Sequence, residues 1–428
     1  MRIGIISQWY PPEPGMFIPA SLAAELAARG HQVRVLTGFP NYPEGKVYPG
    51  YRQRWCEDSM AGGVTVRRVP LYTSHDSSSV RRAANYLSFA ATSSMAAARY
   101  LAQADALYIY HPPATAFTAA ALLRLLRQIP ALLHVQDVWP ESVTTSAMAP
   151  GGPAGRYLHH ALGLTMHRVY EASAAIVVIA PGMRDLVVTR GAAPDKVHTV
   201  LNWADEAVFR PRRTTEDGRR AIGYRGRCTV MYAGNIGLFQ NIEGAIRAAA
   251  ATDCIDLVLV GSGLTKEPAR TLAAELAAEN VRFLEPRPPA EVAVLQAAAD
   301  FQLVSLRDLP VLRGTIPSKL QTALCSGSPV IVAARGDCAD LVDRHNVGLT
   351  CRPEDPPALS TAFLRAAALS PQSRAAMGLR ARLVYEQHMS QRSGIDQIEK
   401  LLESAARQRG RLPHRRARAS RRRPAISA

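Results

Sequence analysis

The stretch Thr315-Ile316-Pro317-Ser318-Lys319-Leu320, which continues through Gly327-Ser328-Pro329 into Val330-Ile331-Val332-Ala333-Ala334, predicts a short helix that returns directly to a buried strand. Proline at the start, a hydroxyl and a cation in the first turn, and glycine at the end form the asymmetric pattern of helix termini. The apolar run after the glycine is typical of a strand buried on both faces. A helix that leads into such a strand is the crossover unit of a parallel α/β sheet.

The same alternation extends over most of the 428 residues, where strand-like runs alternate with alanine- and leucine-rich helical runs. This is the pattern of parallel sheets with right-handed crossovers, so the predicted fold class is α/β. The predicted strands fall into two sets, one at 2–7, 33–37, 64–69, 106–110, 132–136, 175–179 and 197–201, and the other at 229–233, 256–260, 281–284, 301–305, 330–333 and 348–350.

A polar segment without hydrophobic periodicity, 210–218, separates the two sets and marks a linker. We therefore predict two facing, doubly wound Rossmann-like domains, 1–209 and 210–388, with a ligand cleft between the carboxyl ends of their strands. Residues 389–406 are predicted to form a helix that packs back on the first domain. Residues 407–428 are predicted to form a basic, disordered tail.

The net charge of +16 is concentrated in this tail, which contains nine arginines and no acidic residue, so that 16 − 9 = +7 remains for the rest. For the tail we favour attraction to an anionic membrane surface over specific nucleic-acid binding. A solvated tail is the alternative.

Targeting and redox features predict a cytoplasmic protein that lies on the inner face of the cell membrane. The first residues lead straight into a strand-like run that is too short for a signal sequence. The longest charge-free apolar candidate, 83–98, is diluted by serine, threonine and asparagine, so it is not expected to cross a membrane, although it could lie on one. The six cysteines are scattered without metal-binding spacing, which predicts reduced thiols and no metal site.

Lys319 stands out because the chain contains only five lysines among its 51 basic residues. The first turn of a helix presents unpaired N–H groups and the positive end of the dipole. Ser318 and Lys319 in that turn are therefore predicted to complete a phosphate site, and a diphosphate-bearing ligand is the first candidate. The alternative is a solvated lysine at an ordinary helix start.

Glycine-containing loops follow several predicted strands. Gly15 precedes the first helix, while Gly234-Asn235 and the pair Gly261 and Gly263 follow strands of the second domain. None forms a G-x-G-x-x-G fingerprint, but glycine at these places permits the close approach of phosphates. We favour a nucleotide cradle over simple tight turns.

Acidic residues and a histidine gather at the end of the predicted strand 132–136. Asp137 falls at the strand exit and is the best candidate for an acid/base or substrate-orienting role. Glu141 and His134 are further catalytic candidates, although an N-terminal helix position for Glu141 and a satisfied core position for His134 are alternatives. His111 is expected at the rim without an assigned role.

With these residues in view, the sequence resembles the family-4 glycosyltransferases, retaining enzymes of the GT-B fold. Within that family it is similar to bacterial polysaccharide enzymes of the colanic-acid fucosyltransferase and amino-sugar transferase type. The motifs that carry the resemblance span residues 7 to about 335 and read S-Q-W-Y-P-P-E (7–13), T-G-F-P-N-Y-P (37–43), Y-P-G-Y (48–51), Q-D-V-W-P-E-S (136–142), Y-A-G-N-I-G (232–237) and P-S-K-L (317–320).

The resemblance implies transfer of a sugar from a nucleotide-diphosphate donor to an acceptor held mainly by the first domain, with retained anomeric configuration, no cofactor and no obligatory metal. Lys319 and the loops at Gly234, Gly261 and Gly263 would hold the diphosphate. The expected acceptor is a lipid-diphosphate-linked saccharide in surface polysaccharide synthesis, and the sugar moved is a hexose, deoxy sugar or amino sugar.

The sequence also departs from the family pattern. A pair of glutamates common in the family, the second of which binds ribose, corresponds to Gly314 and Thr322, and a common arginine and lysine correspond to Asn235 and Gln240. Thr322 is retained as a donor-binding candidate. Two alternatives to the transferase remain: a nucleotide-sugar epimerase of the same architecture, and a non-catalytic basic adaptor for membranes or nucleic acid.

Overall fold

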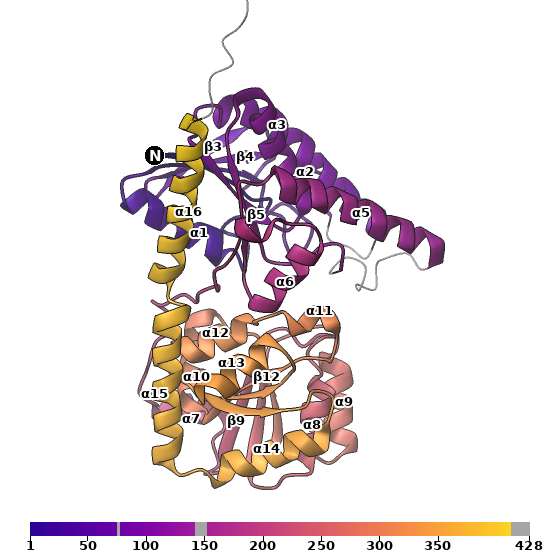
Figure 1. The fold of residues 1–428 in the computed structure, drawn as a ribbon. Helices are drawn as coiled ribbons and strands as arrows, with labels where there is room; N and C mark the ends of the chain where they lie inside the picture. The colour runs from indigo at the N-terminus through magenta and orange to yellow at the C-terminus, as the bar shows by residue number, and fades with distance from the viewer. Residues whose placement is uncertain (75–77, 142–151, 412–428) are drawn as a thin grey trace, which may run out of the picture.

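The computed structural model describes residues 1–74, 78–141 and 152–411, which form two α/β domains stacked end to end (Figure 1). Each domain is built on its own sheet, and the two sheets have eight and six strands. The predicted α/β class and the two-sheet architecture are confirmed.

The sheet of the first domain has the order β3-β4-β2-β1-β5-β6-β7-β8, and every pairing except that of β3 with β4 is parallel. Its central strands are apolar on both faces, as expected when helices cover both sides of a sheet. The strands are β1 (Arg2–Ile6), β2 (Gln32–Gly38), β3 (Glu57–Ala61), β4 (Val64–Val69), β5 (Ala106–His111), β6 (Ala131–Val135), β7 (Ala175–Val178) and β8 (Val197–Thr199).

Helices cover both faces of this sheet. The apolar faces of α2, α3, α5 and α6 pack on one side, and α1 and α16 pack on the other. Alternate strand residues divide between the two layers, so that Ile6 contacts the first and Ile5 the second. The helical elements are α1 (Phe17–Ala28), α2 (Ser79–Tyr100), η1 (Ala114–Ala116), α3 (Phe117–Arg127), α5 (Gly152–Ala172), α6 (Pro181–Thr189) and η2 (Pro194–Lys196), with α16 (Gln391–Arg411) added from the end of the chain.

The second domain has a fully parallel sheet in the order β11-β10-β9-β12-β13-β14. Its strands are β9 (Cys228–Ala233), β10 (Ile255–Val260), β11 (Val281–Leu284), β12 (Phe301–Ser305), β13 (Val330–Ala333) and β14 (Gly348–Cys351). Its helices are α7 (Glu216–Ile222), α8 (Ile242–Ala250), α9 (Lys266–Glu275), α10 (Pro289–Ala298), α11 (Pro310–Arg313), α12 (Ser318–Cys325), α13 (Asp337–His345), α14 (Pro356–Ala368) and α15 (Pro371–His388).

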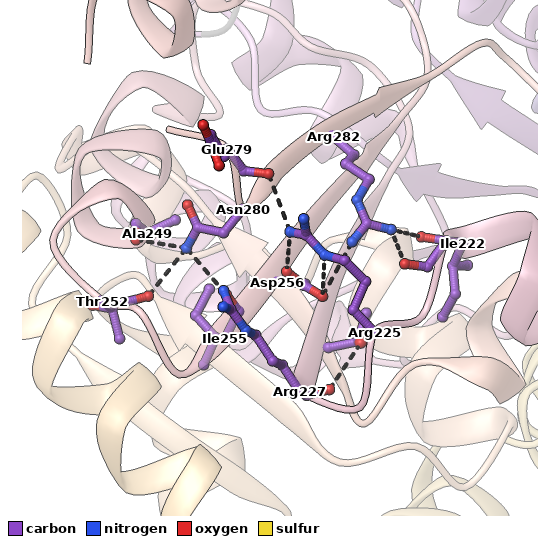
Figure 2. A network of polar contacts seen from close by, with 12 residues as sticks. Ile222, Arg225, Arg227, Ala249, Thr252, Ile255, Asp256, Glu279, Asn280 and Arg282 are labelled. Carbon is purple, nitrogen blue, oxygen red and sulfur yellow. Dashed lines mark hydrogen bonds and ion pairs between the residues drawn. The ribbon is translucent and has the colours of Figure 1, made fainter. Parts of the chain in front are cut away.

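A polar network closes the amino end of this second sheet (Figure 2). Asp256, near the start of β10, is only 1% exposed and forms ion pairs with Arg225 at 2.7 Å and Arg282 at 3.1 Å. The amide of Asn280 donates to three backbone carbonyls of neighbouring segments. Because β10 has six residues, this network lies roughly 15–20 Å from the carboxyl edge, where ligands bind to open parallel sheets. Its charges are therefore structural.

The linker is shorter than predicted. Residues 216–218 already belong to α7, because the Thr215 side chain caps this helix by accepting a hydrogen bond from Gly218 N at 3.0 Å. The chain also returns to the first domain at its end, where α16 buries Ile395 and Ile398 against the face covered by α1. Figure 1 shows α15 and α16 running along one side of both domains.

The carboxyl edges of the two sheets face each other. Asp337, the first residue of α13 after β13, accepts a hydrogen bond from Gly182 N at the start of α6 over 2.6 Å. Gly314 packs against the same backbone, since a Cβ built on it would lie 3.0 Å from Gly182 C. The ends of β7 and β13 therefore meet across the domain boundary, which places the predicted site between the domains.

Candidate functional site

Three glycines form a cradle at the carboxyl edge of the second sheet. Gly234 follows β9, and Gly261 and Gly263 follow β10, next to the point where the strand order reverses between β9 and β12. Their φ angles are 133°, 141° and 149°, a region that other residues rarely adopt. A Cβ at Gly261 would lie 2.0 Å from the carbonyl oxygen of Gly234, and one at Gly263 would lie 2.3 Å from that of Ile236. Only glycine fits where these loops stack.

The side chain of Lys319 reaches into this cradle from the first turn of α12. A Cβ built on Gly234 would lie 3.0 Å from both Cε and Nζ of Lys319, and Nζ lies 4.9 Å from the ring centroid of Tyr232. The predicted residues Gly234, Gly261, Gly263 and Lys319 therefore lie close together, although they come from three separate segments of the chain.

The ammonium of Lys319 has no anionic partner among the described residues. Burial alone lowers the pKa of Lys319 to about 8, and no neighbouring carboxylate offsets it. Lys266 in the same domain provides the contrast, because its ammonium is ion-paired with Glu285 at 2.9 Å. A desolvated cation without a counter-ion costs stability unless a ligand supplies the negative charge.

Two of the other predicted donor-binding residues, Ser318 and Asn235, are the sequence neighbours of Lys319 and Gly234. Ser318 is exposed as the first residue of α12, and Asn235 is exposed directly after Gly234. The hydroxyl of Thr322 donates to the carbonyl of Lys319 at 3.1 Å, so it is engaged within the helix. Gly15 is exposed in the loop before α1, in the other domain.

Asp137 lies directly after β6 at the carboxyl edge of the first sheet. Its carboxyl is open to solvent, yet the surrounding protein desolvates it enough to raise its pKa. It also raises the pKa of the neighbouring Tyr110. Within the described part of the chain no ion pair or hydrogen bond engages the carboxyl, so it is free to contact a ligand.

His134 lies in β6, three residues before Asp137, and is wholly buried. Its Nδ1 contacts the hydroxyl of Tyr108 at 2.5 Å and its Nε2 contacts the amide nitrogen of Gln136 at 2.9 Å. The Gln136 amide also exchanges hydrogen bonds with Asn202, at 3.2 and 2.6 Å. Since that amide nitrogen donates, Nε2 accepts, and the imidazole is neutral with its proton on Nδ1. Burial lowers its pKa to about 3, so His134 holds the Gln136-Asp137 strand exit in place.

Glu141, the third catalytic candidate, forms an ion pair with Arg190 at the end of α6. The partner is 49 residues away in the sequence, and nothing in the local pattern of either residue indicates the contact. The pair ties the segment after β6 to α6.

An aromatic row lines the carboxyl edge of the first domain and was not predicted as a unit. Ring centroids lie 5.5 Å apart for Trp9 and Tyr42, 6.3 Å for Trp9 and Tyr86, and 6.2 Å for Tyr86 and Trp139. His111 continues the row at 5.5 Å from Trp139. It is fully buried rather than at the rim, and neither of its ring nitrogens has a hydrogen-bond partner in the described structure.

Glu13 is a further buried residue that the sequence did not single out. Its carboxylate accepts from the backbone N–H groups of Tyr10, Asn41 and Tyr42 at 2.8–3.0 Å. Burial raises its pKa, and these three hydrogen bonds oppose the rise. Glu13 therefore joins the loops after β1 and β2 that carry Trp9 and Tyr42. Its position two residues before Gly15, in the loop after the first strand, was the feature of the sequence that could have drawn attention to Glu13.

Within the described ranges no cluster of histidine, cysteine or acidic side chains has the arrangement of a metal site. No helix described here has the length and apolarity needed to span a bilayer. The disordered tail was predicted to begin at 407, but residues 407–411 form the end of α16. Residues 412–428, like Ser142 at the end of the Q-D-V-W-P-E-S motif, lie outside the described residues.

Comparison with known proteins agrees with this geometry. Residues 19–203 match the family described as glycosyl transferase 4-like domain, and residues 219–368 match glycosyl transferases group 1. The chain is 26% identical over 326 residues to the putative colanic acid biosynthesis glycosyl transferase WcaI of Escherichia coli K12, covering 72% of this chain and 77% of that protein.

Two solved structures share the fold. Sucrose-phosphate synthase from Thermosynechococcus elongatus superposes with a TM-score of 0.73 at 17% identity, covering 94% of this chain and 98% of its own. HepE of Anabaena in complex with UDP-glucose gives 0.68 at 15% identity, covering 94% and 100%. Both family matches describe glycosyltransferases, which favours the transferase over the epimerase and the adaptor. With its two domains assigned in this way, the chain belongs to the glycosyltransferases of the GT-B fold.

Proposed function

We propose that the protein is a retaining glycosyltransferase that moves a sugar from a nucleoside-diphosphate donor to a lipid-diphosphate-linked saccharide in surface polysaccharide synthesis, at the inner face of the cell membrane. The observation that supports donor binding is the half-buried ammonium of Lys319. It lies beside the three glycines of the cradle and has no counter-ion among the described residues. The complex of HepE with UDP-glucose supports a nucleotide sugar as the donor.

The cradle suits a diphosphate leaving group. Cleavage of the bond between the anomeric carbon and the donor phosphate oxygen leaves the electron pair on the diphosphate. The acceptor oxygen forms the new glycosidic bond, and its proton passes to the departing phosphate oxygen. Lys319 and the amide groups of the glycine loops stabilise the negative charge that develops, and they need no reorganisation to do so. Ser318 and Asn235 lie where they can contact the same phosphates.

The residues proposed to bind the acceptor belong to the first domain. The carboxylate of Asp137, free of protein partners in the described chain, would accept a hydrogen bond from the acceptor hydroxyl and orient it. The partly exposed rings of Trp9, Tyr42 and Tyr86, backed by the buried Trp139, offer surfaces for sugar rings. The printed name of WcaI, a colanic acid biosynthesis enzyme, supports a polysaccharide precursor as the acceptor.

The test is a panel of nucleoside-diphosphate sugars incubated with a lipid-linked saccharide extract, for the wild type, Lys319→Ala and Lys400→Ala. Lys400 is exposed on α16 and serves as the charge-matched control. We expect transfer from at least one donor, retained configuration by NMR of the product, and a loss of about two orders of magnitude in turnover for Lys319→Ala alone. Equal turnover in the two variants would contradict the role of Lys319, and inverted product would contradict the retaining mechanism.

A further inference from the structure

Helix α2 carries apolar side chains on both of its faces. Its inner face contributes Phe89, Ala96 and Tyr100 to the core. Its outer face carries Val80, Leu87 and Met95, which are 77%, 62% and 56% exposed. At 100° per residue these three side chains fall within one third of the helix circumference. Ala84 and Ala91 fill the positions between them, and Ala98 continues the stripe beyond Met95. The outer stripe therefore runs the length of the helix.

The surroundings of this stripe are cationic. Helices α2, α3 and α5, which cover the same face of the sheet, contain seven arginines and a single acidic residue, Glu171. Arg81 and Arg99 flank the stripe at its two ends. Other exposed apolar side chains of this layer are Leu125 and Leu126 on α3 and Tyr157 and Leu164 on α5, which extends beyond the body of the domain in Figure 1.

The helix also borders the acceptor side of the site. Tyr86 stands in the aromatic row between Trp9 and Trp139, and Asn85 accepts a hydrogen bond from the Gln8 amide at 2.6 Å. One helix thus has the carboxyl edge of the sheet on one side and an apolar, cationic surface on the other. A lipid-linked substrate needs this arrangement, because its saccharide must reach the cleft while its chain stays in the bilayer.

We propose that the outer face of α2, with the exposed side chains of α3 and α5 beside it, docks on an anionic bilayer. This inference rests on the proposed function for its acceptor. Apolar side chains enter the interfacial region and arginines attract acidic headgroups, whereas a protein partner would not require the near absence of acidic residues. The surface is distinct from the basic tail, whose contribution is electrostatic only.

The experiment measures co-sedimentation of the full-length protein with vesicles of phosphatidylcholine containing 30 per cent (about 0.3 mole fraction) phosphatidylglycerol, a composition chosen to supply the anionic surface. The variant is the double substitution Leu87→Asp and Met95→Asp. The matched control is Leu364→Asp on α14 of the second domain, where the wild-type side chain is 53% exposed. We expect at least a tenfold loss of vesicle affinity for the double variant and no change for the control.

Two further measurements make the outcome decisive. Nucleoside-diphosphate affinity and transfer to a short-chain, water-soluble acceptor should be unaltered in the double variant, which shows that it is folded. Unchanged vesicle binding by the double variant would refute the proposed docking surface and leave the proposed function intact. Sedimentation showing that the substitutions dissociate a dimer would have the same two consequences. Failure of the wild type to transfer to any lipid-linked acceptor would instead overturn the proposed function.

Discussion

Substitution of Lys319 by methionine should make the protein more stable and less active at the same time. Methionine has nearly the same length and no charge, so it removes the ammonium without opening a large cavity. The pKa of Lys319 falls from its ordinary value of 10.5 to about 8 because the folded state desolvates the ammonium. This difference corresponds to a cost of up to about 3 kcal/mol for holding the charged lysine at pH 7, reduced by any solvent that reaches it.

The sign of the pH dependence follows from the same shift. Between pH 8 and 10.5 the unfolded lysine keeps its proton while the folded one has lost it, so the stability of the wild type rises through this window. The advantage of Lys319→Met is therefore full below pH 8, shrinks as the pH rises and disappears above 10.5. Urea unfolding at pH 7 and at pH 10 measures it directly.

The matched control is Lys266→Met. Lys266 is also buried in the second domain but is ion-paired with Glu285, so its loss should not stabilise the protein. A nucleoside diphosphate should raise the unfolding midpoint of the wild type and of Lys266→Met much more than that of Lys319→Met. The reasoning is refuted if Lys319→Met is destabilised at pH 7, or if its gain does not depend on pH.

Three further substitutions test the contact between the domains, the packing of α16 and the role of Asp137. Gly314→Glu introduces a glutamate where the family resemblance expects one, but its Cβ would lie 3.0 Å from Gly182 C. We therefore expect kcat/KM to fall at least tenfold. A gain in kcat/KM would show that the domains do not meet at Gly314. Gly394→Ala places a methyl group 2.5 Å from the ring of Trp203 and should lower the free energy of unfolding by about 1–3 kcal/mol in thermal melts, whereas an unchanged midpoint would mean that α16 shifts without cost. Asp137→Asn should reduce transfer by about two orders of magnitude and leave nucleoside-diphosphate affinity within about twofold by calorimetry; a parallel loss of both would place Asp137 in the donor site.

The sequence was sufficient to predict the two sheets because thirteen of their fourteen strands are short runs rich in apolar or β-branched residues, some continuous and some alternating with polar residues, between helical patterns. The strand that was missed, β3, reads E-D-S-M-A and is exposed over four of its five residues. Its pairing with β4 is antiparallel and lies at the sheet edge, so it carries no burial pattern.

The proximity of Lys319 to the loops of Gly234, Gly261 and Gly263 was also predictable, since glycines after strands and a cation after a helix-starting proline are local signals. What the sequence did not provide were contacts between distant segments. Glu141 pairs with Arg190, and Gly314 packs on Gly182, across separations that no periodicity reports. The close packing at Gly314 leaves little room for a larger side chain there.

The most direct test of the central claim is proton uptake when a nucleoside diphosphate binds. Lys319 is about half protonated at pH 8 in the free protein, and a bound diphosphate should keep it fully protonated. Isothermal titration calorimetry at pH 8 in two buffers of different ionisation enthalpy should therefore show uptake of about half a proton by the wild type and none by Lys319→Met. Equal uptake and equal affinity in the two proteins would contradict the account.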